Sequence, residues 1–186
     1  DHGALELPES LKLKKIDAGR VSSQQEKKVF AQILNQIDLK IGPGKVVEYN
    51  NNFYFHNGLT DKEKKIASNT IKDLVFNIEG VRMALSPKEI MGLPKSKENT
   101  RLKNMIHPTR SPDIYVILKE NWLWRSTPGT SHGSHYSYDS HIPLIFSKKG
   151  IKHSIQNKSV YSVDVSPTIA KYLGLKYPKN IDGRAL

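Results

Sequence analysis

The sequence predicts a fold that mixes helices and strands. Two segments carry apolar residues at helical spacing, and short β-prone runs alternate with them along the chain. The 186 residues are enough for one domain of ordinary size, or for a small domain with part of another. With 37% hydrophobic and 25% charged residues the composition is close to the globular average, so wholesale disorder is not expected.

The first helix is expected to begin at residues 23–26, where Ser-Gln-Gln-Glu has the form of a capping box. Apolar residues then recur at helical spacing at Val29, Phe30, Ile33, Leu34 and Ile37. The Gly-Pro-Gly stretch at residues 42–44 ends this helix. Two β-prone runs follow at residues 45–49 and 53–56, and the three Asn residues between them predict a hairpin whose turn adopts positive φ.

A second helix is predicted from Thr60-Asp61 to Gly80, a natural C-terminal cap. Its apolar face consists of Ala67, Ile71, Leu74, Val75 and Ile78. Residues 81–85 predict a strand, and residues 86–109, rich in Lys, Pro, Asn and Gly, predict loop with short helix. The helix–hairpin–helix–strand order therefore indicates a compact α+β unit.

Two β-rich runs, at residues 112–118 and 142–147, predict strands on either side of a long loop. A loop longer than about 15 residues inside a compact domain is usually functional or disordered. The last predicted element is a helix that starts at Ser166-Pro167 and runs to about Leu173, just before Gly174.

The chain is basic, with 29 Lys and Arg against 18 Asp and Glu and a formal net charge of +11. Such a charge can attract nucleic acid, anionic membrane or a phosphorylated substrate. The basic residues are scattered, however, and the sequence carries no RNA-binding aromatic motif, zinc finger or basic helix, so a solvated basic surface is expected and nucleic-acid binding is not. The apolar run at residues 142–146 is far short of the roughly 20 residues of a membrane helix.

Residues 129–144, which cover the end of this loop and the start of the second β-rich run, hold His132, His135, Asp139 and His141. This composition is typical of a functional site. The chain contains no Cys, so a zinc site would have to use imidazole and carboxylate ligands. A second set of such donors, Asp1 and His2, opens the chain, and the glycine that follows them permits the turn that would bring both to one metal.

The Asp-His-Gly start and the Gly-Thr-Ser-His-Gly stretch at residues 129–133 resemble the two late metal-binding motifs of the alkaline phosphatase superfamily. The similarity is to the branch of phosphate-irrepressible alkaline phosphatases and type I phosphodiesterase/nucleotide pyrophosphatases. Residues 110–114, 138–144 and 165–170 continue it. The resemblance implies the C-terminal part of an alkaline phosphatase-like α/β/α sandwich, with a small α+β insertion subdomain.

The resemblance also implies a division of the chain into three parts. Residues 1–21 would be the start with the first metal motif and a connector, residues 22–105 the cap-like insertion, and residues 106–186 the C-terminal part of the catalytic core. Because the chain opens inside a motif, an N-terminal portion of the protein is expected to precede it.

The same resemblance assigns roles to the site residues. Asp1 and His2 would bind one of two zinc ions and His132 the other. Asp139 and His141 are candidates for orienting a metal-bound His, or for a polar loop end that is hydrogen-bonded to backbone. His135 is a possible ligand, or an exposed loop histidine.

The implied function is metal-dependent hydrolysis of phosphate monoesters on small molecules. Its Ser or Thr nucleophile would precede Asp-His-Gly, so no catalytic nucleophile is expected here and these 186 residues alone are expected to be inactive. Phosphodiesterase or nucleotide pyrophosphatase activity is an alternative, with sulfatase more distant. A non-catalytic basic module that binds an anionic polymer or a protein partner is an alternative of another class. The family implies a periplasmic or secreted protein, whereas the oligomeric state stays open.

Overall fold

The computed structural model describes residues 2–147, 149–150 and 152–186, so Asp1 lies outside the described residues. The chain divides into two compact units, one that ends at Ile142 and one that runs from Pro143 to Leu186. The three-part division implied by the resemblance, with boundaries at residues 21 and 105, stays a prediction.

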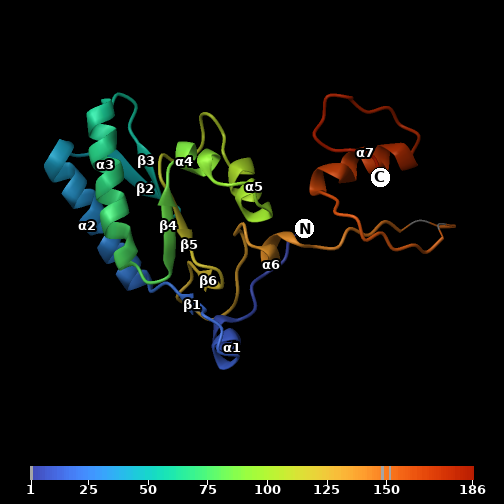
Figure 1. Ribbon diagram of the computed structural model, residues 1–186, viewed down its shortest axis with the longest axis horizontal. Coiled ribbons are helices and arrows are strands. Elements are labelled where there is room, and N and C mark those ends of the chain that lie inside the picture. Colours follow the sequence, from blue (N-terminus) through green and yellow to red (C-terminus); the bar gives the residue numbers. More distant parts are fainter. Residues whose placement is uncertain (1, 148, 151) are drawn as a thin grey trace. The chain divides into compact units, whose positions relative to one another are not determined.

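The larger unit mixes helices and strands, as the sequence predicts (Figure 1). Its α-helices are α1 (Pro8–Leu13), α2 (Ser23–Ile41), α3 (Asp61–Leu74), α4 (Pro87–Gly92), α5 (Lys97–Asn104) and α6 (Ser137–Ser140), and a 3-10 turn, η1 (Val75–Asn77), follows α3. Its strands are β1 (Gly19–Arg20), β2 (Val46–Tyr49), β3 (Asn52–Phe55), β4 (Val81–Leu85), β5 (Tyr115–Leu118) and β6 (Trp122–Leu123). The smaller unit contains the 3-10 turn η2 (Ser162–Asp164) and helix α7 (Val165–Tyr172).

The two long predicted helices are present as α2 and α3, but the predicted end of the second at Gly80 is wrong, because α3 ends at Leu74 and the 3-10 turn η1 follows it. Helix α2 is capped by Ser22, one residue before the expected position, because the Ser22 hydroxyl accepts the backbone N–H of Gln25 at 3.4 Å. Helix α3 begins with a capping box, in which Thr60 and Glu63 each accept the other's backbone N–H. Their apolar faces pack together in the main core.

The predicted hairpin is also confirmed. Strands β2 and β3 pair antiparallel, with Val46 opposite Phe55. The turn residues Asn50 and Asn51 have φ of 49° and 61°, the positive values that a two-residue turn between strands requires. The hairpin then joins β5, since the Phe53 N–H donates to the Ile114 carbonyl at 3.0 Å.

Strands β4 and β5 pair antiparallel and form the middle layer of the larger unit. Successive side chains of a strand point to opposite faces. On one face Val116 and Leu118 pack in the core that α2 and α3 cover. On the other face Tyr115 and Ile117 pack against α4 and α5. The result is an α/β/α arrangement, in which helices lie on both sides of the strand pair (Figure 1).

The β4–β5 pair contains a bulge at Arg82. Val81 lies opposite Leu118 and Met83 lies opposite Ile117, so Arg82 is one extra residue without a partner on β5. A bulge of this kind turns a side chain away from the direction that a regular strand would give it.

The structure overturns one predicted strand. Residues 142–147 form no strand, and the side chain of Ile145 is 80% exposed. A strand needs a neighbour that takes up its backbone N–H and C=O groups, and the described residues offer this run none. The apolar composition of residues 142–147 is suited to a strand, but it carries no information on whether a partner strand is present.

In the smaller unit the last residues of the chain fold back onto α7. The carboxylate of Asp164 accepts the backbone N–H of Arg184 at 2.8 Å and that of Tyr161 at 3.0 Å. These bonds, led by the one from Arg184, lower the pKa of Asp164. The Leu186 N–H donates to the Thr168 hydroxyl at 3.1 Å. The predicted terminal helix is confirmed, beginning one residue earlier than expected.

Among the helices that the structure describes, none has both the length and the apolar content needed to cross a membrane.

Candidate metal centre

The segment that carries His2 runs along the histidine-rich loop. The Gly3 N–H donates to the Asp139 carbonyl at 2.9 Å, and the Leu5 N–H donates to the Ser131 carbonyl at 3.4 Å. The Thr130 hydroxyl donates to the Leu5 carbonyl. Three hydrogen bonds thus join two motifs that lie far apart in the sequence.

Gly3 allows this close approach because it has no side chain. A Cβ atom at this position would lie 1.9 Å from the Tyr138 carbonyl oxygen, well inside contact distance. The glycine after Asp1 and His2 therefore has a spatial role in addition to the flexible turn that the sequence suggested.

The two candidate ligands in the described part of the site, His2 and His132, are in contact. Their rings are stacked, with centroids 3.5 Å apart and planes 17° from parallel. Nδ1 of His2 lies 2.8 Å from the Gly3 carbonyl oxygen, which can only accept, so Nδ1 carries a proton. The structure thus brings the Asp-His-Gly motif and the histidine-rich loop together.

The start of the loop is held by Arg20 on β1. Its guanidinium donates to the Thr127 carbonyl at 3.0 Å and to the Gly129 carbonyl at 2.7 Å. The same guanidinium pairs with Glu9 at 2.6 Å, and its hydrogen bonds lower the pKa of Glu9 to about 2. Gly129 and Gly133, on either side of His132, both have φ of 106°, which favours glycine at these positions.

Asp139 is buried and accepts a backbone hydrogen bond. Its Oδ2 accepts the Ser134 N–H at 2.6 Å, whereas Oδ1 is buried with no hydrogen-bond partner among the described residues. His141 is exposed, and its backbone N–H donates to the Ser137 carbonyl at 2.8 Å. The structure thus gives Asp139 a backbone partner, while a role for Asp139 or His141 in orienting a metal-bound histidine stays a prediction.

His135 corrects the sequence analysis. The expectation that it lies exposed is wrong, because its side chain is only 5% exposed and its Nε2 lies 3.1 Å from Glu98 Oε1. Its possible role as a metal ligand stays a prediction. Burial lowers the pKa of His135, and the nearby Glu98 carboxylate opposes this shift. Sequence analysis missed Glu98, because its contact with His135 joins residues 37 positions apart.

The described residues supply only part of a metal site. Within residues 2–147, 149–150 and 152–186, no three His, Asp or Glu side chains gather closely enough to hold a metal ion. His2 and His132 provide two imidazoles, whereas a zinc ion in a protein usually has four ligands. The assignment of Asp1, His2 and His132 as ligands stays a prediction.

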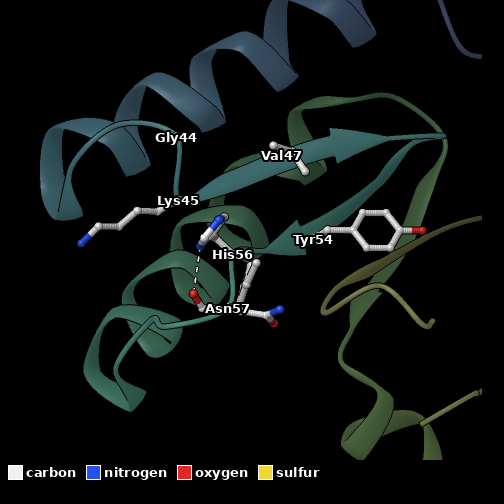
Figure 2. Close-up of a pocket in the computed structure, with 7 residues that line it drawn as sticks. Gly44, Lys45, Val47, Tyr54, His56 and Asn57 are labelled. Carbon is white, nitrogen blue, oxygen red and sulfur yellow. Dashed lines mark hydrogen bonds between the residues drawn. The ribbon is translucent and has the colours of Figure 1, made fainter. Parts of the chain in front are cut away.

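The described residues of the larger unit line at least two hollows. One, of about 270 Å³, lies between the loop and the neighbouring strands, and His132, Tyr136, Asp139, Trp122 and Trp124 are among its lining residues. A second, on the β2–β3 hairpin, is shown in Figure 2. There the exposed His56 donates from Nδ1 to the Asn57 carbonyl at 2.9 Å.

No family model matches the chain. The fold is that of the α/β alkaline phosphatases: it matches the 1.7 Å crystal structure of wild type alkaline phosphatase PafA with a TM-score of 0.78 and 26% identity. That match covers all of this chain and 36% of the PafA chain, in its C-terminal third.

The sequence relatives agree with the fold. The chain is 30% identical to alkaline phosphatase PhoV of Synechococcus elongatus and 28% identical to alkaline phosphatase PafA of Elizabethkingia meningoseptica, and both matches cover the whole chain. It spans about a third of the length of these relatives, 34% and 35%. The chain is thus similar over its whole length to proteins named alkaline phosphatases, and the resemblance seen in its motifs is confirmed.

Proposed function

We propose that the chain is the C-terminal part of a metal-dependent hydrolase that removes phosphate from monoesters, with Asp1, His2 and His132 among the ligands of a two-zinc centre. The observation that carries this proposal is the contact between the rings of His2 and His132. In sequence, one lies near the start of the larger unit and the other near its end. We choose phosphomonoesters over phosphodiesters as substrates because the relatives are named alkaline phosphatases.

The chemistry of the donors fits zinc, although their number does not complete a site. Imidazole nitrogen is a good zinc ligand, and a metal-bound histidine commonly donates its other ring N–H to a carbonyl, as His2 does to Gly3. We therefore propose that the remaining ligands and a Ser or Thr nucleophile belong to a part of the protein that precedes the Asp-His-Gly motif. Bound zinc would offset the charge of the phosphate ester and activate the attacking hydroxyl.

The residues of this chain would hold the metal ligands His2 and His132 in place. Three hydrogen bonds hold the His2 segment against the loop, and Arg20 fixes the loop where it approaches His132. Rigid placement of ligands is what an active centre of this kind requires from its scaffold. The net charge of +11 would draw phosphorylated small molecules toward the protein, which we propose to act in the periplasm or outside the cell.

The first test is a zinc titration of the 186-residue chain by calorimetry. We expect weak binding that decreases further in His2→Ala and in His132→Ala. His56→Ala is the matched control, because His56 is an exposed histidine on the hairpin. Binding that is the same in all four proteins would contradict the assignment of the two ligands.

A second test separates the enzyme from the basic module. In a protein extended to the length of its relatives, His132→Ala should lower kcat/KM by more than the roughly 10–100-fold that loss of a ligand's supporting partner costs. Salt-dependent binding to generic DNA that ignores both His132→Ala and a chelator would instead favour the non-catalytic module.

A further inference from the structure

Side chains from helix α5 and from the bulge of β4 form hydrogen bonds with the middle of the histidine-rich loop. Arg82 donates to Glu98 Oε1 at 2.6 Å and to the Tyr136 hydroxyl at 3.2 Å, and the Tyr136 hydroxyl donates to the Leu118 carbonyl at 2.8 Å. Arg82 is the extra residue of the bulge, so the irregularity in β4 directs its guanidinium toward the loop.

Glu98 is the centre of this contact. Its Oε1 atom accepts from both Arg82 and His135. Partial burial disfavours the Glu98 carboxylate, but hydrogen bonds from Arg82 and His135 outweigh this effect and lower its pKa. An ionised carboxylate only accepts hydrogen bonds, so Nε2 of His135 carries the proton that joins them.

Helix α5 makes a second contact one turn further on. Arg101 donates to the His135 carbonyl at 3.2 Å, so His135 is held by its backbone and by its side chain from the same helix. The spacing of Glu98 and Arg101 puts both on one face of α5.

These contacts lie between the two parts of the loop that matter for the site. His132 lies three residues before His135, and Asp139, whose carbonyl accepts the Gly3 N–H, lies three residues after Tyr136. A loop that is fixed at residues 135–136 and tied to Gly3 at residue 139 has little freedom to carry His132 away from His2.

We propose that Glu98, supported by Arg82 and Arg101, is a positioning residue that holds His132 against His2. The inference rests on the proposed function, since it assigns a task at the same site. Arg82 and Glu98 keep 43% and 35% of their side chains exposed, so their ion pair adds little stability by itself. Its effect is geometric, on the placement of the loop.

The test compares Glu98→Ala with the unchanged chain in the absence of metal. Two signals are read by NMR: the NOE between the ring protons of His2 and His132, and the hydrogen exchange of the Ser134 amide, which donates to Asp139. In Glu98→Ala we expect the NOE to disappear and the Ser134 amide to exchange at least about tenfold faster, while the helices keep their protection.

Lys72→Ala is the matched control, because it removes an ion pair with Glu89 that joins α3 to α4. It should leave both signals unchanged. A folded Glu98→Ala protein with a wild-type NOE and wild-type exchange at Ser134 would overturn the proposal. If Glu98→Ala does not fold, Arg101→Ala decides, since it removes the bond to the His135 carbonyl: unchanged exchange at Ser134 would then overturn it.

A zinc titration of the same samples keeps the two proposals apart. Loss of the NOE in Glu98→Ala, with zinc binding absent even in the unchanged chain, would support the positioning role and contradict the metal centre. If zinc binding depends on His132 but the NOE is unchanged in Glu98→Ala, the result would support the metal centre and contradict the positioning role of Glu98.

Discussion

At Gly3, the absence of a single carbon atom allows two distant histidines to meet. The backbone there passes so close to the Tyr138 carbonyl that no side chain fits. Overpacking of this kind forces backbone shifts that typically cost about 1–3 kcal/mol.

Gly3→Ala should therefore destabilise the larger unit by about 1–3 kcal/mol and separate the rings of His2 and His132. Urea unfolding measures the first effect and the ring NOE measures the second. Gly92→Ala is the control, since a Cβ at Gly92 would meet nothing within 4 Å. Equal stability of the two variants would show that the N-terminal segment does not depend on the close approach.

Arg20 offers a second test at the residue scale. The pKa of Glu9 is about 2 instead of its ordinary 4.5, chiefly because Arg20 donates hydrogen bonds to it. Since the pKa is lower in the folded state, the pair stabilises the fold above about pH 4.5, and the effect is lost as the pH falls toward 2.

In Arg20→Gln, the carboxyl titration of Glu9, followed by NMR, should move up toward 4.5. Glu63 is the control: its pKa is also lowered to about 2, first of all by a hydrogen bond from Lys45, and it should not respond. A Glu9 midpoint that stays near 2 would contradict the pairing.

Single residues also mark the limit of prediction from sequence. The approach of His2 to His132 follows from the family motifs, whereas the burial of His135 does not. Its partner Glu98 lies on a short helix in a segment predicted as loop with short helix, and no local pattern links the two positions. Contacts of this kind depend on the packing of the whole unit.

At the scale of the element, local signals were sufficient where the stabilising contacts are local. The helix N-caps and the Asn-rich turn are formed by residues within a few positions of each other. The hairpin and α2 appear where the sequence predicts them, and α3 begins where it is predicted. The run at residues 142–147 behaves differently, because strand formation depends on a neighbour that the sequence of the run does not specify.

The capping box of α3 provides the test at this scale. Thr60→Ala removes the oxygen that accepts the Glu63 N–H, and it should cost about 1 kcal/mol of stability. Thr60→Ser keeps the oxygen and should be close to neutral. Thermal unfolding of the three proteins measures the difference, and an Ala variant as stable as the Ser variant would show that the cap is not needed.

At the scale of the whole molecule, the buried apolar clusters all lie in the larger unit. Each of the three clusters is made of residues that precede Ile142. The smaller unit instead leaves large apolar side chains exposed at Ile155, Tyr161, Leu173 and Leu175. Its stability therefore depends on few apolar contacts of its own.

A chain that ends at Ile142 should consequently fold by itself. We expect its urea midpoint to lie close to that of the 186-residue chain, because the truncation removes no member of the three clusters. Circular dichroism against urea concentration measures both midpoints. Loss of the cooperative transition on truncation would mean that residues 143–186 stabilise the larger unit.

The bulge at Arg82 has a consequence for how such proteins diverge. A one-residue deletion in β4 would restore a regular strand and, in the same event, remove the cation that Glu98 shares with His135. Among relatives, the presence of the extra residue in β4 and of an acidic residue at the position of Glu98 should therefore vary together. Relatives with a regular β4 are expected to have no acidic residue on the matching turn of helix α5.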